Sequence, residues 1–96
     1  MVDRNKELRG KVAIITGSTR NIGQVTAGEL ARAGASVVVN GMQDKSACEA
    51  VAARISDAGG KAIPVMADIS KKEGVDRLTA ETLRAFGGID ILILNA

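Results

Sequence analysis

The stretch TGSTRNIG, residues 16–23, decides how this chain is expected to fold. It follows a short apolar run, 12–15, and opens a segment whose apolar residues recur at helical spacing. In that setting a glycine loop can hold a phosphate group, because the free N–H groups at the helix start point at the anion. Gly17 would allow the sharp turn out of the strand, and Gly23 would let the helix pack closely. The stretch predicts a pyrophosphate site, with a plain structural turn as the alternative.

Asn21 lies in the middle of this loop, where a third small residue would be expected. Asparagine enters the left-handed backbone region more readily than other residues that carry a Cβ. It can therefore replace a glycine here, and its side chain offers a donor for the phosphate. Steric intrusion into the phosphate site is the competing interpretation.

Apolar runs and amphipathic segments alternate along the rest of the chain, and each amphipathic segment stops at a glycine. Ser46 with Glu49, and Ser70 with Glu73, fit the capping-box pattern, so we expect these serines to open the second and third helices. The expected strands are 12–15, 37–39, 62–67 and 91–94, with the helices between them. The side chains predicted to face the core are Ile22, Val25, Leu30 and Ala33 in the first helix, Cys48, Val51, Ala52 and Ile55 in the second, and Val75, Leu78, Thr82 and Phe86 in the third.

This order of elements predicts an α/β fold, in which right-handed crossovers build a parallel sheet with helices on both faces. Pro64 lies in the third strand and lacks the N–H that a ladder hydrogen bond needs, so that strand should lie at a sheet edge. The strand order 3-2-1-4 meets this condition. It is the first half of a Rossmann-type, doubly wound sheet, whose ligand-binding switch point lies between the first and fourth strands.

The composition excludes several kinds of partner. The chain has 96 residues, 46% of them apolar, with no histidine and a net charge of +2, which allows one small aliphatic core. The small charge and the absence of a basic cluster argue against nucleic acid, and no apolar stretch is long enough to span a membrane. Cys48 is the single cysteine, which excludes an internal disulfide and suits the cytoplasm. No metal site is expected.

Several motifs resemble those of the short-chain dehydrogenase/reductase family. Residues 16–23 resemble its cofactor motif TGxxx(G/A)xG, with Asn21 as the departure, and residues 10–15 resemble its first strand. Asp68-Ile69 resembles the pair that flanks the adenine ring in this family. The resemblance implies that the Asp68 carboxylate accepts from the adenine amino group while the Ile69 N–H meets the ring. A helix-leading carboxylate is the structural alternative for Asp68.

The last three residues carry a further motif. Leu94-Asn95-Ala96 resembles the family's NNAG sequence at the end of the fourth strand, with Leu94 in place of the first Asn. The resemblance implies cofactor contacts from Asn95 and Ala96, with stabilisation of the sheet as the alternative role of Asn95. Taken together, the motifs that resemble this family cover nearly the whole chain.

The charges near the second strand favour NADP(H), with NAD(H) as the alternative cofactor. An NAD site usually has an acid at the end of that strand, where this chain has Asn40 and no carboxylate until Asp44. Arg20 resembles the basic residue that pairs with the 2′-phosphate in NADP-using members, unless it is only a solvated surface charge. The expected cofactor contacts are Gly17, Ser18, Thr19, Arg20, Asn21, Ile22, Gly23, Asn40, Asp68, Ile69, Asn95 and Ala96.

The resemblance also implies the chemistry: reduction of a carbonyl or oxidation of an alcohol, with a Tyr, a Lys and a Ser as catalytic groups. This chain contains no tyrosine, so no catalytic residue is expected within it. We therefore expect residues 1–96 to be the N-terminal part of a single NAD(P)-binding Rossmann domain, the rest of which is not in this chain. The partner would be a small carbonyl or alcohol substrate, and the intact protein would be a homotetramer or homodimer.

Two other classes of function stay open at this point. A non-catalytic NADP(H)-sensing or regulatory module would keep the fold and bind the cofactor without turnover. An S-adenosylmethionine-dependent methyltransferase also has a glycine loop after its first strand, but that class favours an acid where this chain has Asn40. Within the short-chain dehydrogenase/reductase family, these residues do not distinguish a 3-oxoacyl reductase from a sugar, steroid or polyol dehydrogenase.

Overall fold

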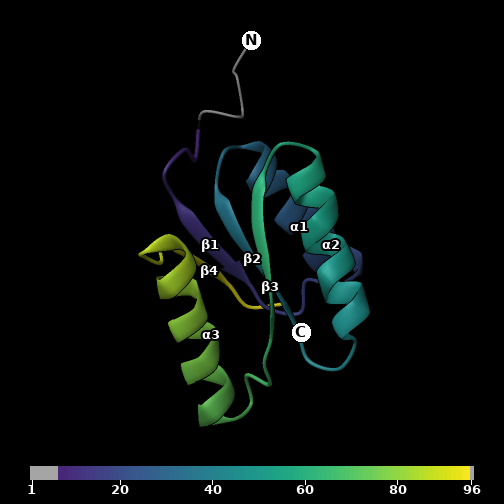
Figure 1. Ribbon diagram of the computed structural model, residues 1–96, viewed down its shortest axis with the longest axis vertical. Coiled ribbons are helices and arrows are strands. Elements are labelled where there is room, and N and C mark those ends of the chain that lie inside the picture. The colour runs from purple at the N-terminus through teal and green to yellow at the C-terminus, as the bar shows by residue number, and fades with distance from the viewer. Residues whose placement is uncertain (1–6, 96) are drawn as a thin grey trace.

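Residues 7–95 form a parallel sheet with helices on both faces, as described by a computed structural model (Figure 1). Strands and helices alternate from the first strand to the last, which confirms the expected α/β fold. The elements are β1 (Val12–Ile15), α1 (Asn21–Arg32), β2 (Ser36–Gly41), α2 (Lys45–Asp57), β3 (Lys61–Met66), α3 (Lys72–Phe86) and β4 (Ile91–Ile93).

The strand order is β3-β2-β1-β4, as predicted. Pro64 lies on the edge strand β3, opposite Val39 of β2, so its missing N–H removes no bond from the centre of the sheet. β1 pairs in parallel with both β2 and β4. Asp90, just before β4, accepts from the Val12 N–H through Oδ2 at 2.8 Å and fixes the start of that pairing.

The two faces of the sheet carry separate apolar layers. Ala13 and Ile15 of β1 point towards α1 and α2, while Ile14 points towards α3, because successive side chains on a strand alternate between faces. Figure 1 shows α1 and α2 on one side of the sheet and α3 on the other. The second helix buries the predicted stripe of Cys48, Val51, Ala52 and Ile55.

The inner faces of the other two helices differ from the expected ones. α1 packs on the sheet through Gly23 and Ala27, which lie one turn apart and allow a close approach. Ile22 and Val25, predicted to be buried, are 75% and 64% exposed because they flank this narrow contact. In α3 the prediction holds for Leu78 and Thr82, which are buried, and is wrong for Val75 at 46% exposure; Phe86 is half-buried.

Neither predicted capping box forms. Asp44 caps α2, and its Oδ1 accepts from the Ala47 N–H at 2.9 Å, so the helix begins one residue before Ser46. α3 has no side-chain cap, because Ser70 turns back to hydrogen-bond Asp68 instead. In α2 the Asp44 carboxylate thus makes the bond expected of Ser46, whereas in α3 the Ser70 hydroxyl is used locally by Asp68 and the helix start is left uncapped.

Candidate functional site

The loop between β1 and α1 lies at the carboxyl ends of the strands, between β2 and β4. Gly17, its first glycine, is held from both sides: its N–H donates to Asn40 Oδ1 of β2 at 3.3 Å, and its C=O accepts from Asn95 Nδ2 at 3.0 Å. The backbone of Gly17 is left-handed, with φ of 58°. A Cβ at this residue would lie 2.7 Å from the Asn95 main-chain oxygen. The prediction that Gly17 makes a sharp turn is confirmed.

Gly23 sets how closely α1 approaches this loop. A Cβ added there would overlap the Gly17 main-chain oxygen and would lie 2.7 Å from Asn95 Nδ2 and 2.9 Å from Ser18 Cα. Contacts this short exclude any side chain unless the loop moves. The helix start and the loop are therefore packed directly on each other.

A row of backbone N–H groups remains free where the helix begins. The Ser18 N–H donates to the Asn40 main-chain oxygen at 2.9 Å, and the Gly17 N–H is taken by the Asn40 side chain. Across residues 7–95, no acceptor is found for the N–H groups of Thr19, Arg20, Asn21, Ile22 or Gly23, and α1 has no side-chain cap. Unpaired N–H groups together with the positive end of the helix dipole form an anion-binding site.

Asn21 has φ of 55°, the one left-handed residue besides glycine in the described part of the chain. This confirms the expectation that asparagine takes a glycine-like backbone here. Its side chain is exposed. Its left-handed backbone forms the turn from the loop into α1, which begins at this residue.

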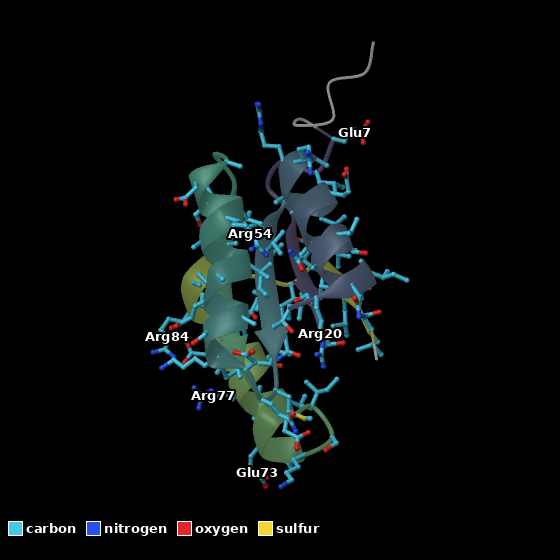
Figure 2. The ribbon with its side chains drawn as sticks, turned by 90° about the vertical axis from the view of Figure 1, so that its right-hand side faces the viewer. Glu7, Arg20, Arg54, Glu73, Arg77 and Arg84 are labelled. Carbon is cyan, nitrogen blue, oxygen red and sulfur yellow. The ribbon has the colours of Figure 1, made fainter. Side chains whose placement is uncertain are left out.

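Arg20 precedes α1 in an extended conformation, with φ of −162° and ψ of 170°. Its side chain is exposed and has no ion pair among residues 7–95. Figure 2 shows it at the start of α1, beside the carboxyl ends of the strands. A free guanidinium at this place is available to an anionic ligand.

Unlike Arg20, Ser18 and Asn40 are buried. The sequence predicts cofactor contacts from both, but the structure places their side chains inside the protein. Ser18 Oγ donates to the Ile15 carbonyl at 2.7 Å and accepts from the Asn40 N–H at 2.9 Å. We assign these side chains to the support of the loop.

Asp68 and Ile69 follow β3 on the neighbouring loop. Asp68 Oδ1 accepts from the Ser70 N–H at 3.0 Å and from Ser70 Oγ at 2.6 Å. These hydrogen bonds, first that of the Ser70 side chain and then that of its backbone, lower the pKa of the Asp68 carboxyl. The carboxylate therefore stays charged through neutral pH, and its Oδ2 has no partner within the described residues.

Asn95 joins β4 to β1. Its N–H donates to Thr16 Oγ1 at 2.9 Å, in addition to the bond from Nδ2 to Gly17. The sheet-stabilising role that the sequence left open for Asn95 is thus present. Thr16, buried at 2% exposure, was missed by the sequence analysis, although it opens the quoted stretch. Ala96, a predicted contact, lies outside the described residues.

A hollow of about 580 Å³ lies elsewhere, between α1 and α2. Its walls include Val51, Arg54 and Gly60, and Figure 2 shows Arg54 over the gap between the two helices. No residue of the glycine loop lines it, so we do not place the cofactor there. Metal-ligating side chains do not gather in groups of three or more between residues 7 and 95, and no helix in that range is long and apolar enough to cross a bilayer.

Comparison with known proteins agrees with this geometry. Residues 11–96 match the family model of the short chain dehydrogenases. A 3-oxoacyl-[acyl-carrier-protein] reductase of Synechocystis sp. is 45% identical over 89 residues, which cover 93% of this chain and 36% of that protein. A hydroxynaphthalene reductase-like protein Arp2 of Metarhizium brunneum is 44% identical over 91 residues, which cover 95% of this chain and 34% of that protein.

Solved structures show the same similarity. A hydroxysteroid dehydrogenase from Escherichia coli superimposes with a TM-score of 0.91 at 37% identity, over 99% of this chain and 40% of that one. A dehydrogenase/reductase from Sinorhizobium meliloti 1021 gives a TM-score of 0.90 at 36% identity, over 97% of this chain and 37% of that one. The chain spans about a third of the length of the curated relatives that it matches.

Proposed function

Because the chain belongs to the short-chain dehydrogenase/reductase family, whose members are oxidoreductases with nicotinamide dinucleotide cofactors, we propose that it binds NADP(H) for such an enzyme. The observation that carries the proposal is the row of unpaired N–H groups from Thr19 to Gly23 at the start of α1. A pyrophosphate placed against this row would accept several hydrogen bonds and meet the positive end of the helix dipole.

The surroundings of β2 support the choice of NADP(H) over NAD(H). At the end of β2, Asn40 is buried and Gly41 has no side chain. Met42 is the first exposed side chain after them, and the first carboxylate, Asp44, lies beyond the strand end, where its Oδ1 caps α2. The end of β2 itself therefore carries no acid to accept from the ribose hydroxyls of NAD. Arg20 instead offers a free guanidinium, which would pair with a 2′-phosphate.

The adenine end of the cofactor would lie against the loop after β3. There Asp68 Oδ2 and the Ile69 N–H have no partner within residues 7–95, so an acceptor and a donor are available side by side. Asn95 and Ala96 remain proposed contacts at the end of β4. When bound, the cofactor would supply or accept a hydride at its nicotinamide ring.

The substrate side of the reaction lies outside these residues. No tyrosine occurs among the 96, so the proton transfer that accompanies reduction of a carbonyl or oxidation of an alcohol is proposed to use groups beyond residues 1–96. The cytoplasmic location and the assembly into a homotetramer or homodimer stay predictions from the sequence. The test of the proposed function is titration of the full-length protein with NADPH and with NADH, followed by turnover assays with small carbonyl compounds. NADPH binding without turnover of any of them would favour a sensing module instead.

Arg20→Ala in the full-length protein is expected to weaken NADPH binding and leave NADH binding nearly unchanged. The loss should be roughly 1–3 kcal/mol, the range for a hydrogen bond to a charged group. Dissociation constants for both cofactors, measured by isothermal titration calorimetry, check it. Arg54→Ala removes the same charge from the hollow between α1 and α2 and should change neither constant. If Arg20→Ala weakens the binding of NADPH and NADH equally, Arg20 does not bind the 2′-phosphate.

Asn21→Gly is expected to preserve or slightly improve NADPH binding. Glycine adopts the left-handed backbone of this position without the steric cost that a Cβ brings, so the N–H row keeps its geometry. The same titration checks this prediction. A loss of about tenfold or more, roughly 1.4 kcal/mol, would instead make the Asn21 side chain a phosphate ligand.

A further inference from the structure

Asn40 uses every polar group of its backbone and side chain within the protein. It is 3% exposed. Its N–H and C=O both bond Ser18, at 2.9 Å each. The side-chain Oδ1 accepts from the Gly17 N–H at 3.3 Å, while Nδ2 donates to the carbonyls of Val65 at 3.1 Å and Ala67 at 3.2 Å, with a longer contact of 3.4 Å to that of Gly41.

These bonds connect three segments that are distant in sequence. One amide on β2 reaches the glycine loop with its oxygen and the end of β3 with its nitrogen, just before Asp68. Only an amide presents an acceptor on one side and two N–H donors on the other. The orientation of the side chain is fixed, because the reverse would place Oδ1 against two carbonyl oxygens. A buried network of this kind holds its members rigidly when every group is satisfied.

We propose that Asn40 is a positioning residue that holds the phosphate-binding loop and the adenine-binding loop in register. The proposal rests on the proposed function, since it assigns the pyrophosphate to the loop at Thr19–Gly23 and the adenine to Asp68 and Ile69. It differs from the sequence prediction, in which Asn40 itself contacts the cofactor. Asn40 instead acts through Gly17 and Ala67.

The nearly isosteric Asn40→Asp variant separates these two roles. An ionised Asp at this position has no donor, and it would set a carboxylate oxygen against the Val65 and Ala67 carbonyls. If Asn40 touched the ribose, the added acid would favour NADH, as acids at this place generally do. If Asn40 positions the loops, the variant weakens NADPH and NADH by the same factor, because both cofactors need both loops.

The experiment uses the full-length protein at a temperature at which circular dichroism shows each variant fully folded. We expect Asn40→Asp to raise the dissociation constants of NADPH and NADH about tenfold or more, the effect of leaving buried polar groups unpaired. Ile55→Ala is the matched control, because it destabilises the core on the α1 and α2 face, in a cluster that contains no residue of either loop. It should leave both constants within about twofold.

The pH profile adds a readout that general destabilisation does not move. Protonation of the new carboxyl restores one O–H donor towards β3, so cofactor affinity of Asn40→Asp should recover as the pH is lowered. The titratable or charged groups in the segments next to position 40, residues 16–23, 41–49 and 64–69, are Arg20, Asp44, Lys45, Cys48, Glu49 and Asp68, all of which the wild type also carries. Burial raises the pKa of the Cys48 thiol, and Ser70 lowers that of Asp68. An inflection seen only in the variant therefore belongs to the new carboxyl.

Amide hydrogen exchange of the cofactor-free protein tests the positioning itself. Asn40→Asp should lose protection at the Ala67 N–H, which bonds the Gly41 carbonyl beside the new carboxylate, while the Gly17 N–H keeps an oxygen acceptor in the new side chain. Asn40→Ser, a smaller change that cannot reach both loops, should lose protection at one or both. If the wild-type protein binds no NADPH, the proposed function is wrong. The exchange measurement would still decide whether Asn40 positions the two loops. The proposal is overturned if both variants keep protection in both loops, or if Asn40→Asp strengthens NADH binding while it weakens that of NADPH.

Discussion

Gly23→Val is expected to abolish NADPH binding by the full-length protein, with a dissociation constant raised more than about a hundredfold, or roughly 2.8 kcal/mol. The first atom of the new side chain would overlap the Gly17 main-chain oxygen and lie 2.7 Å from Asn95 Nδ2. α1 would have to move away from the loop to make room. The N–H row of Thr19–Gly23 would then no longer converge on one anion.

Gly28→Val is the matched control for this variant. Gly28 lies in the same helix, but a Cβ there would meet only Arg32 Nη2, at 4.0 Å. It should bind NADPH as the wild type does, and Gly28→Ala should stabilise the protein by up to about 1 kcal/mol through helix propensity. Titration calorimetry and thermal melts of the variants make the comparison. If Gly23→Val binds NADPH with wild-type affinity, the glycine loop is not part of the cofactor site.

Residues 1–96 expressed alone are expected to be aggregated or molten and catalytically inactive. β4 has no strand on its second edge within the described residues, and its Leu92 is 57% exposed on the face that α3 covers elsewhere. Leu94, directly after β4, is 72% exposed, and α1 adds the exposed Ile22 and Val25. An open strand edge beside uncovered apolar side chains is a template for pairing between chains.

Size-exclusion chromatography and thermal melts of residues 1–96 test this second expectation. We expect no sharp melting transition and elution as large species. Leu92→Lys should shift the elution towards the monomer, since a charge at an open edge strand blocks pairing between chains. A cooperative, monomeric melt that moves upward with NADPH would contradict the prediction and favour a self-sufficient binding module.

The fold could be predicted because several independent signals agreed. The glycine loop indicated the first strand and helix, and the glycines that follow each amphipathic segment indicated the helix ends. Pro64 indicated that β3 lies at the sheet edge. Each of these signals is local in the sequence, and each acts through the backbone conformation that one residue permits or forbids. The same is true of Asn21, whose left-handed backbone followed from its side-chain type.

The roles of single side chains were less predictable, because they depend on which groups the fold brings together. Asn40 and Ser18 lie 22 residues apart, and nothing local shows that they bond each other. Spacing alone assigned Ile22 and Val25 to the core, whereas the close approach of α1 at Gly23 and Ala27 excludes them. Asp44 replaced Ser46 as the cap of α2, and Ser70 donates to the Asp68 carboxylate, so that α3 has no side-chain cap.

The place of β1 between β2 and β4 has a consequence during synthesis on the ribosome. Thr16, just after β1, bonds Asn95, 79 residues later in the chain. At a translation rate of 5–20 residues per second, about 4–16 s separate the synthesis of these two residues. During that time one edge of β1 has no neighbouring strand, and the Gly17 C=O lacks its hydrogen bond from the Asn95 side chain. That edge of β1 is therefore open to pairing with other chains until β4 has been synthesised.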